Sequence, residues 1–432
     1  MSLETRSCSP RVSIVEQAKD MQGLLLNHSI QRLSTAYFFS KCGEFAFEAA
    51  FAVAVVTLAE ANFLLIGLVY FFRYLPCALF SPLGGWLADN CVKKNTLVMA
   101  ELAKIFVAGL LFVVFEFAYA TVTIVTILSM LLTALDCIYA PTFRAYFPDV
   151  VSDDKLAVVN SGVQVIEDSS SIIGPLIFSL IAILLSPSFT FAFFAFCLML
   201  SAACALTLVS IPKKEKASLN VLELFKEAGA SVGDLRSTNA PLFAVICCTT
   251  FCAIFATSII RFILPASVLE TFQSEAAVGY VFSLLAIGTV IGSMLYVRFN
   301  RITTARSVIK YWTLYGVIFL MAAIALEFNV YVFLVLLLFT GLIGAFVDIA
   351  IVTNIQSLSG SQQVGRNFSL YYFTAVLGDA LSGLVASLMF VIVGPATFIG
   401  MTFMLSIAPL RWSLKRDEGT NKDRAERVSR IS

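Results

Sequence analysis

Twelve apolar runs, each long enough to cross a lipid bilayer, follow one another along this 432-residue sequence. A membrane-spanning helix needs about 20 mostly apolar residues. Hydrophobic residues make up 59% of the chain and charged residues 13%, whereas a soluble domain has roughly half and a quarter. The sequence therefore predicts an all-α integral membrane protein. The expected spans are 33–58, 63–88, 95–115, 120–147, 156–185, 188–211, 241–269, 276–298, 306–326, 329–355, 365–393 and 395–412.

Polar segments divide these spans into two sets of six. The longest polar segment inside the chain follows the sixth span and carries a cluster of lysines. The predicted parts are an N-terminal tail (1–32), a six-helix bundle (33–211), a linker (212–240), a second six-helix bundle (241–412) and a C-terminal tail (413–432).

Basic residues predict the orientation in the membrane, because loops rich in Lys and Arg stay in the cytoplasm. Of the 29 Lys and Arg residues, four lie in the interior of spans, and the other 25 lie in polar segments or at span ends on the side of the N terminus. Both termini, the linker and both tails are therefore expected in the cytoplasm. The first thirty residues are polar, so no cleavable signal peptide is expected. Together with the short loops, this favours a bacterial inner (plasma) membrane.

Several function classes find no support in the sequence. The chain has one histidine, no cluster of metal-ligand residues, no nucleophile beside a base and no glycine-rich phosphate loop, so we expect no enzyme activity, cofactor or metal site. A net charge of +1 without a basic patch gives no reason to expect nucleic-acid binding. The ten cysteines lie almost entirely in apolar runs, and we expect them to be small core residues without disulfides.

Charged residues inside the spans are the main functional signal. Each costs about 2.5–3.5 kcal/mol at bilayer depth, so ten of them facing lipid would exceed the roughly 5–15 kcal/mol that stabilises a protein. They must be paired, protonated or exposed to a water-filled cavity. The ten are Lys41, Glu44, Glu48, Arg73, Asp136, Glu167, Asp168, Arg261, Asp348 and Asp379.

The first span carries three of these charges on one helix face. Lys41, Glu44 and Glu48 are spaced by three and four residues. Two carboxylates one turn apart repel each other in a low dielectric, which favours a bound proton on one of them. The alternative is a buried ion pair that only fixes helix packing. Our candidates for proton coupling are Glu44, Glu48, Asp136, Glu167 and Asp168.

Other residues on the same spans are candidates for substrate contact. The arginines would attract an anionic substrate or balance the acids, and tyrosines would line a pocket for a bulky molecule. The candidates are Lys41, Arg73, Arg261, Asp348, Asp379, Tyr70, Tyr371 and Tyr372. The third span adds Glu101 and Lys104, spaced to pair with each other.

The two halves resemble each other in the placement of acids. Asp136 in the fourth span and Asp348 in the tenth are 212 residues apart, and Asp168 and Asp379 are 211 apart. Such offsets are typical of parallel repeats in transporters.

The loop after the second span carries a motif. Gly85, Leu87, Asp89, Lys93 and Lys94 resemble the loop between the second and third helices of major facilitator superfamily transporters, although Asn90 and Val92 depart from that pattern. The resemblance implies two six-helix bundles that work by alternating access. It also implies that spans three, six, nine and twelve support the others, and that the acid of this loop and Arg144 help to latch the bundles. The alternative is a hairpin with no role in switching.

A second resemblance lies in the fourth and fifth spans. Tyr139-Ala140-Pro141, Pro148 to Val151 and Gly174-Pro175 are similar to the branch that contains the enterobactin exporter and macrolide efflux pumps, with the lysophospholipid transporter a near relative. In antiporters of this superfamily a Gly-Pro motif bends the fifth span. Gly174 and Pro175 are thus candidates for a helix bend, or mark an incidental kink.

These observations favour a proton-coupled exporter of a small amphiphilic or chelating molecule, such as a siderophore or macrolide-like compound. The alternative on the same fold is an importer of a chelate, nutrient or lysophospholipid; a membrane-embedded enzyme or scaffold is more remote. The expected partners are a small-molecule substrate, protons and the lipid bilayer, and the expected state is a monomer.

Overall fold

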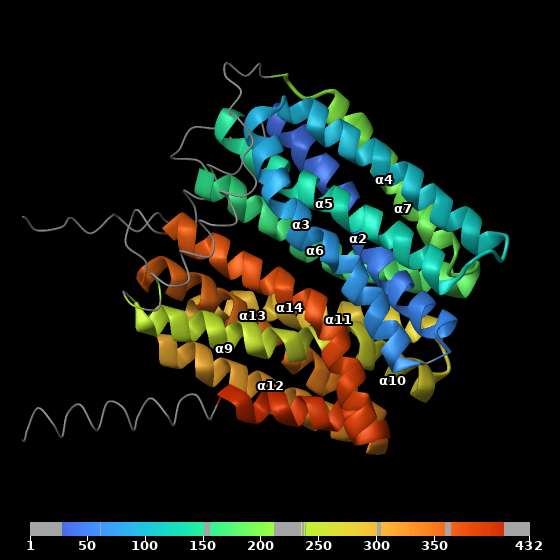
Figure 1. Ribbon diagram of the computed structural model, residues 1–432, viewed down its shortest axis with the longest axis vertical. Coiled ribbons are helices and arrows are strands. Elements are labelled where there is room, and N and C mark those ends of the chain that lie inside the picture. Colours follow the sequence, from blue (N-terminus) through green and yellow to red (C-terminus); the bar gives the residue numbers. More distant parts are fainter. Residues whose placement is uncertain are drawn as a thin grey trace, which may run out of the picture.

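The computed structural model describes residues 28–60, 62–150, 156–210, 235, 237, 239–299, 304–358 and 364–409. Every regular element in these residues is a helix, and the helices lie in two groups that follow the two halves of the chain (Figure 1). The first group contains α2 (His28–Leu58), α3 (Phe63–Asn90), α4 (Lys93–Glu116), α5 (Val122–Val150), α6 (Leu156–Leu184) and α7 (Phe189–Leu206).

The second group repeats this arrangement. It contains α9 (Ala240–Ser258), η2 (Ile259–Ile263), α10 (Leu264–Phe272), α11 (Glu275–Phe299), α12 (Ala305–Phe328), α13 (Val330–Leu358), α14 (Val364–Val393), the 3-10 turn η3 (Gly394–Ala396) and a last helix, Thr397–Pro409.

Twelve spans are confirmed. Nine helices of the described residues are long and apolar enough to cross a membrane, and two shorter apolar helices, Leu64–Cys77 and Thr397–Pro409, lie where further spans were expected. The twelfth is α2, which carries the charges of the first predicted span. Helices suit this environment because a helix satisfies its own backbone hydrogen bonds where no water is present.

The seventh span is one continuous rod of three elements. Between α9 and α10 the backbone widens into η2, a π-helix, which carries Arg261. A π segment re-aims side chains within a helix and is frequent at functional sites. The seventh span therefore has an irregular turn in its interior, and this turn carries a charged side chain.

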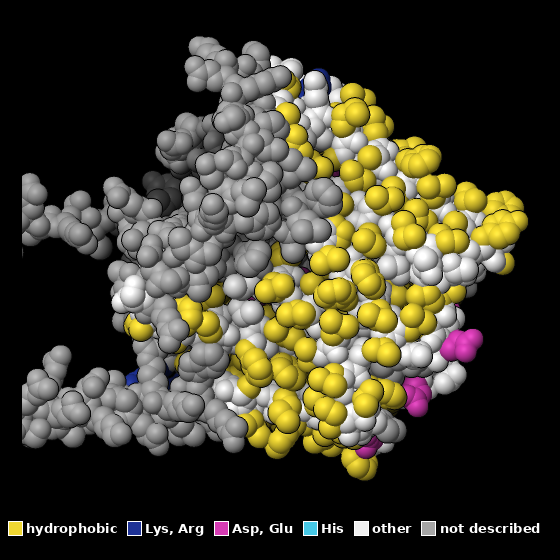
Figure 2. Space-filling model, in the orientation of Figure 1, with side chains coloured by type: hydrophobic (Ala, Val, Ile, Leu, Met, Phe, Trp, Pro, Cys, Tyr) yellow, Lys and Arg dark blue, Asp and Glu magenta, His cyan; other side chains and the backbone are white. Residues whose placement is uncertain are grey.

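The outer surface is apolar. Large hydrophobic side chains such as Met99, Phe106, Met294 and Val391 are two-thirds or more exposed, as expected for a surface that faces lipid. Figure 2 shows one face largely covered by hydrophobic side chains, with acidic side chains at the end of the molecule where α10 lies. That end holds the turns 59–60, 117–121, 185–188 and 273–274, and we call it the predicted outer end.

The bundles meet along two helix pairs, α3 with α14 and α6 with α11. Small residues permit the close approach: a Cβ on Gly383 would lie 2.9 Å from the Cα of Gly67 on α3. On α11, a Cβ at Gly279 would collide with the backbone oxygen of Pro175 and the hydroxyl of Ser179. Close helix contacts through small residues are typical of membrane interfaces.

Hydrogen bonds reinforce these contacts toward the predicted outer end. The Ser179 hydroxyl donates to the Ala276 carbonyl at 2.9 Å, and the Ser283 hydroxyl donates to the Ile172 carbonyl at 3.0 Å. Between α3 and η2, the Tyr70 hydroxyl donates to the Arg261 carbonyl at 3.2 Å. These bonds join the bundles in their outer halves.

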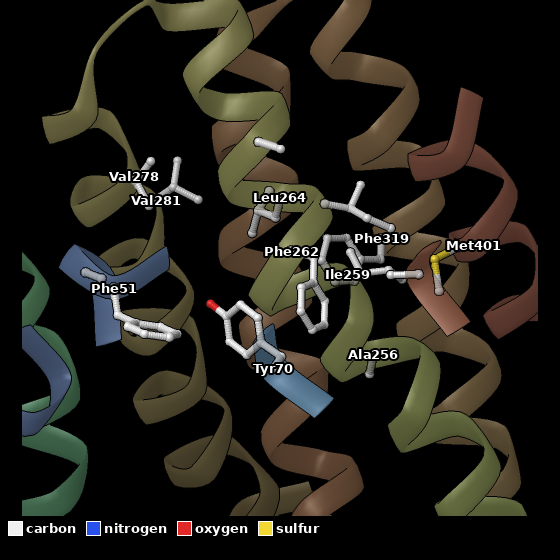
Figure 3. Close-up of a cluster of buried hydrophobic side chains, with 14 of the residues drawn as sticks. Phe51, Tyr70, Ala256, Ile259, Phe262, Leu264, Val278, Val281, Phe319 and Met401 are labelled. Carbon is white, nitrogen blue, oxygen red and sulfur yellow. The ribbon is translucent and has the colours of Figure 1, made fainter. Parts of the chain in front are cut away.

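An aromatic cluster fills the interface beside these bonds. Figure 3 shows Tyr70 reaching toward Phe262 of the second bundle, with Phe51 on its other side. The ring centroids of Tyr70 and Phe262 are 4.3 Å apart and those of Tyr70 and Phe51 are 5.4 Å apart, both edge-to-face. This geometry is favourable for aromatic pairs, so the cluster joins the two halves.

One prediction about the cysteines was wrong. Cys77 of α3 and Cys137 of α5 form a disulfide, with their Cα atoms 5.9 Å apart. Their sequence separation of 60 hid this pairing from the sequence, because only the packing of α3 along α5 brings the two together. Cys42, Cys197 and Cys248 are buried and free, as expected.

Candidate functional site

A cavity of about 570 Å³ lies between the two bundles and is the candidate site. Its walls come from α2, α3, α5 and α6 of the first bundle and from η2, α11, α12 and α13 of the second. A volume of this size suits a small-molecule ligand. Six charged side chains line it: Glu44, Glu48, Arg73, Asp136, Arg261 and Asp348.

Arg73 and Glu48 form the tightest pair in the wall. Both guanidinium Nη atoms bind the Glu48 carboxylate, Nη1 at 3.0 Å from Oε2, and Nε donates to Thr133 at 3.4 Å. The guanidinium carbon lies 4.4 Å from the Phe51 ring centroid. Arg73 is thus held by a two-pronged ion pair and by stacking, and its charge is neutralised by Glu48.

Lys41 and Glu44 pair within α2. The Lys41 ammonium lies 2.7 Å from Glu44 Oε2. The two glutamates of this helix therefore each have a cation of their own, Lys41 for Glu44 and Arg73 for Glu48. The sequence placed both acids on one face but gave no partner for Glu48, because that partner comes from a different helix.

A charged triad, of which Glu101 and Lys104 are buried, connects the supporting helix α4 to the cavity. Lys104 Nζ lies 2.9 Å from Asp136 Oδ1 and 3.6 Å from Glu101 Oε2, and Ser201 of α7 donates to Glu101 at 2.9 Å. The Lys104 ammonium also lies 4.2 Å from the Tyr139 ring centroid. The predicted Glu101–Lys104 pair is confirmed, whereas the contact with Asp136 depends on how α4 faces α5.

The seventh and eleventh spans share a further pair. Arg261 Nη2 lies 3.4 Å from Asp379 Oδ2, and the other carboxylate oxygen accepts from Thr257 at 3.1 Å. The Arg261 guanidinium carbon lies 4.4 Å from the Tyr74 ring centroid, across the bundle interface. Asp379 thus contributes to the cavity through Arg261.

Asp348 differs from the other cavity acids. It lies on α13, is exposed and lines the cavity. Among the described residues, no Lys or Arg side chain forms an ion pair with it. Its electrostatic neighbour is Tyr315 of α12, which also lines the cavity. The ninth span, expected only as a support, therefore reaches the site.

Two other predicted acids lie away from the cavity wall. Glu167 accepts a hydrogen bond from the Tyr37 hydroxyl at 3.2 Å, and Asp168 accepts one from the Gln164 amide at 2.9 Å. Both lie on α6, nearer its N-terminal end than the residues that line the cavity, Ser171 and Pro175. The structure does not bring them together with the acids of α2 and α5.

The three predicted tyrosines also differ in position. Tyr70 lines the cavity. Tyr371 packs against the hydrophobic core, and the side chain of Tyr372 lies outside the described part of the chain. Sequence reasoning missed two further tyrosines of the wall, Tyr74 and Tyr315, and two phenylalanines, Phe45 and Phe282. The available signal for Tyr74 was its position directly after Arg73 on the same helix.

The predicted latch is described only in part. Lys93 donates to Asp149 at 2.6 Å and to the Ala145 carbonyl at 2.7 Å, so it ties α4 to the end of α5. Arg144 is exposed and Lys94 is half-buried. The side chain of Asp89 and the surroundings of Gly85 lie outside the described residues.

The Gly-Pro motif lies inside α6. A Cβ at Gly174 would stand 2.8 Å from the Cys42 carbonyl, so this glycine lets α6 approach α2. Pro175 lies within the helix and lines the cavity, and its missing N–H leaves one carbonyl of the preceding turn without its usual donor. The predicted bend at this motif stays a prediction.

The donor set of the site does not suit a metal. Among the described residues, no group of three or more His, Cys, Asp or Glu side chains could hold a metal ion. The cavity combines aromatic walls with charges from both bundles. Such a site can bind a molecule with apolar and polar parts, and its carboxylates can exchange protons.

Comparison with known proteins identifies the family. The sequence model of the family described as transmembrane secretion effector matches residues 25–425. A mutant of the nucleoside transporter NupG superposes with a TM-score of 0.70 at 12% identity, over 89% of this chain and 99% of that one. A bacterial homologue of the iron transporter ferroportin, in its inward-facing state, gives 0.66 at 15% identity, over 90% and 99%.

A third structure agrees with these two. A POT family transporter in complex with 5-aminolevulinic acid gives a TM-score of 0.65 at 11% identity, over 89% of this chain and 95% of that one. At such identities these structures share the fold. No curated protein matches the sequence. Because the family model covers nearly all of the sequence, this chain belongs to the transmembrane secretion effector family of major facilitator superfamily transporters.

Proposed function

We propose that this transporter exports a small amphiphilic molecule in exchange for protons. The observation that carries the proposal is the cavity between the bundles, where acids stand beside aromatic walls. The description of the family, transmembrane secretion effector, supports the outward direction. A siderophore or macrolide-like compound is the substrate type that the resemblance of the fourth and fifth spans suggests.

Proton coupling would act through the paired acids. Glu44, Glu48 and Asp136 line the cavity, and each holds a cation. Protonation of such a carboxylate removes its attraction for the partner and frees a lysine or arginine to move. A proton and a substrate would then compete for the same charges, which is the requirement for antiport. Glu167 and Asp168, away from the wall, would be relay positions.

Alternating access requires that the bundles open at one end and close at the other. The helix pairs α3–α14 and α6–α11 carry contacts between the bundles, with hydrogen bonds such as Ser179 to Ala276 toward the predicted outer end. This arrangement supports an inward-facing state, in which substrate enters from the cytoplasm. Gly85, Asp89, Lys93, Lys94 and Arg144 would close the opposite end, and Gly174-Pro175 would bend α6 as the state changes.

The remaining assignments follow the sequence. We propose a multi-pass protein of the bacterial inner membrane, with both termini in the cytoplasm and a monomer as the working unit. The two bundles (33–211 and 241–412) move as bodies joined by the linker 212–240, and the tails are 1–32 and 413–432.

Untargeted mass spectrometry tests the direction and the substrate. Extracts and spent medium from strains with and without the gene, grown with scarce and with ample iron, are compared. Export predicts a compound that accumulates inside the deletion strain and is depleted in its medium. A compound that instead remains in the medium of the deletion strain would establish the alternative, uptake.

Proteoliposomes test the coupling. With the identified compound inside the vesicles, an imposed proton gradient should drive its exit when protein is present, and a protonophore should abolish the effect. Transport that follows a sodium gradient and ignores the protonophore would contradict proton coupling.

A further inference from the structure

The charges of the cavity do not balance. The side chains that line it, together with those joined to the lining through one ion pair or two successive ones, comprise four cations and six carboxylates, which leaves a formal charge of −2 when all are ionised. These ten are Lys41, Glu44, Glu48, Arg73, Glu101, Lys104, Asp136, Arg261, Asp348 and Asp379. A low-dielectric site favours ligands that neutralise such an excess.

The cations are already occupied. Arg73 is 3% exposed and binds both oxygens of Glu48, and Lys104 is 1% exposed between two carboxylates. The Arg261 side chain is 29% exposed; its Nη2 contacts Asp379, and its Nη1 is buried with no hydrogen-bond partner among the described residues. An anionic ligand would have to break an existing ion pair to reach Arg73 or Lys104, and would have to displace neighbouring side chains to reach Nη1 of Arg261.

The excess negative charge is partly located at Asp348. Asp136 and Asp348 stand 212 residues apart, and Lys104 and Tyr315 stand 211 apart. Where the first bundle provides the Lys104 ammonium beside Asp136, the second therefore provides the neutral Tyr315 beside Asp348. The same acid is neutralised in one half and open to the cavity in the other.

The surroundings of Asp348 suit an apolar body with a charged end. Phe282, Leu285 and Tyr315 line the same cavity, and Tyr74 stands at the bundle interface. Aromatic faces attract organic cations through their π-electrons. An organic anion, by contrast, would be repelled both by the negative charge of Asp348 and by the negative faces of these rings.

We propose that Asp348 is the subsite for the cationic group of the substrate, and that the substrate class is amphiphilic organic cations. This inference rests on the proposed transport function and narrows it, because it favours a hydrophobic amine over an anionic chelate. The cationic group of the ligand then takes, beside Asp348, the place that the Lys104 ammonium holds beside Asp136 in the first half. Tyr315 positions the charged end against the carboxylate.

A pair of ions with matched shape tests this proposal. Tetraphenylphosphonium and tetraphenylborate are of similar size and apolar surface and carry opposite charges. Equilibrium binding of each ion to the purified full-length protein in detergent is measured, and the phosphonium should bind saturably. The borate should bind at least tenfold more weakly.

Variants locate the binding charge. Asp348→Asn should weaken phosphonium binding by about 10- to 100-fold, the range expected when a charged partner is lost. Asp348→Glu should retain binding, and Tyr315→Lys, which supplies the second half with the missing cation, should lose it to a similar extent. Glu327→Gln, at an exposed position on the predicted outer end of α12, is the matched control and should bind like wild type.

Each other outcome overturns the inference. Tighter binding of the borate, no binding of either ion, or phosphonium affinity within twofold of wild type in a monodisperse Asp348→Asn protein would each do so. The proposed export is tested separately by mass spectrometry. An exported compound without a cationic group would therefore reject this subsite while leaving the transport function in place.

Discussion

The two bundles treat equivalent acids in opposite ways. In the first, Asp136 contacts Lys104, which is also within reach of Glu101. In the second, Asp348 faces the cavity beside Tyr315, with no ion pair among the described residues. The first bundle gives this acid an ion-pair partner, whereas the second leaves the equivalent acid available to a ligand.

This difference separates two uses of a charge inside a membrane protein. A paired charge is held in place by its partner, and removing either member leaves the other uncompensated. An open carboxylate in a water-filled cavity contributes little to the fold and is available for binding. Measurements of stability and of ligand binding on matched variants should therefore distinguish the two halves: variants of the paired acid should lose stability, and variants of the open acid should lose binding.

Lys104→Met should have the largest effect on stability. The ammonium is 1% exposed and lies between Glu101 and Asp136, so its removal leaves the fully buried Glu101 and the partly exposed Asp136 without a cation. Loss of one partner of a buried pair costs about 3–5 kcal/mol. We expect a large fall in the midpoint of unfolding in detergent, measured by a denaturant titration.

The double variant Lys104→Met with Asp136→Asn is the control. Because it removes one orphaned carboxylate together with the cation, it should recover part of the stability. A single variant as stable as wild type would show that the triad is not what neutralises Asp136.

Asp379→Asn should have an intermediate effect. It removes the carboxylate that faces Arg261, but both side chains are about 30% exposed to the cavity, so water can solvate part of the released charge. Charged hydrogen bonds contribute about 1.5–3 kcal/mol, and we expect a loss at or below the lower end of that range. The same unfolding titration measures it, with Thr257→Val as a control that removes only the neutral bond to the carboxylate.

The sequence was sufficient for the spans and for pairs within one helix. Apolar run length located all twelve helices, and a spacing of three residues predicted the pair Glu101–Lys104; the pair Lys41–Glu44 corresponds to the alternative that the sequence left open for the first span. Both depend only on the period of the α-helix. No knowledge of how helices face each other was needed.

The sequence was not sufficient to predict ion pairs or a disulfide between different helices. Arg73–Glu48, Lys104–Asp136 and the Cys77–Cys137 disulfide each depend on the rotation of one helix against another. Apolar runs with charges on few positions do not fix that rotation, because all faces of such helices are similarly hydrophobic. The expectation that Glu44 and Glu48 act on each other lacked this information, since Arg73 comes from α3.

Asp149→Asn separates pairing from burial and should have a small effect. Lys93 Nζ lies 2.6 Å from Asp149 at the predicted cytoplasmic end, where Asp149 is exposed. Exposed ion pairs contribute about 0.2–1 kcal/mol and weaken with salt. Unfolding at low and high ionic strength should show a slight loss that disappears at high salt; a loss as large as that of Lys104→Met would mean that pairing alone, without burial, decides the cost.

Asp348→Asn should have the smallest effect on the fold and the clearest effect on binding. Since no cation depends on this carboxylate among the described residues, its neutralisation leaves no charge behind, and we expect a change within about 0.5 kcal/mol, as for substitutions away from structural features. Asp136→Asn is the matched variant: the same chemical change at the equivalent position should destabilise, because Lys104 loses a partner. If Asp348→Asn unfolded as easily as Asp136→Asn, the second bundle would hold its acid in a structural role and the contrast between the halves would fail. A stable Asp348→Asn protein that has lost affinity for tetraphenylphosphonium would instead show that the two equivalent acids have different roles. Asp136 would then be a structural acid of the first bundle, and Asp348 the ligand-binding acid of the second.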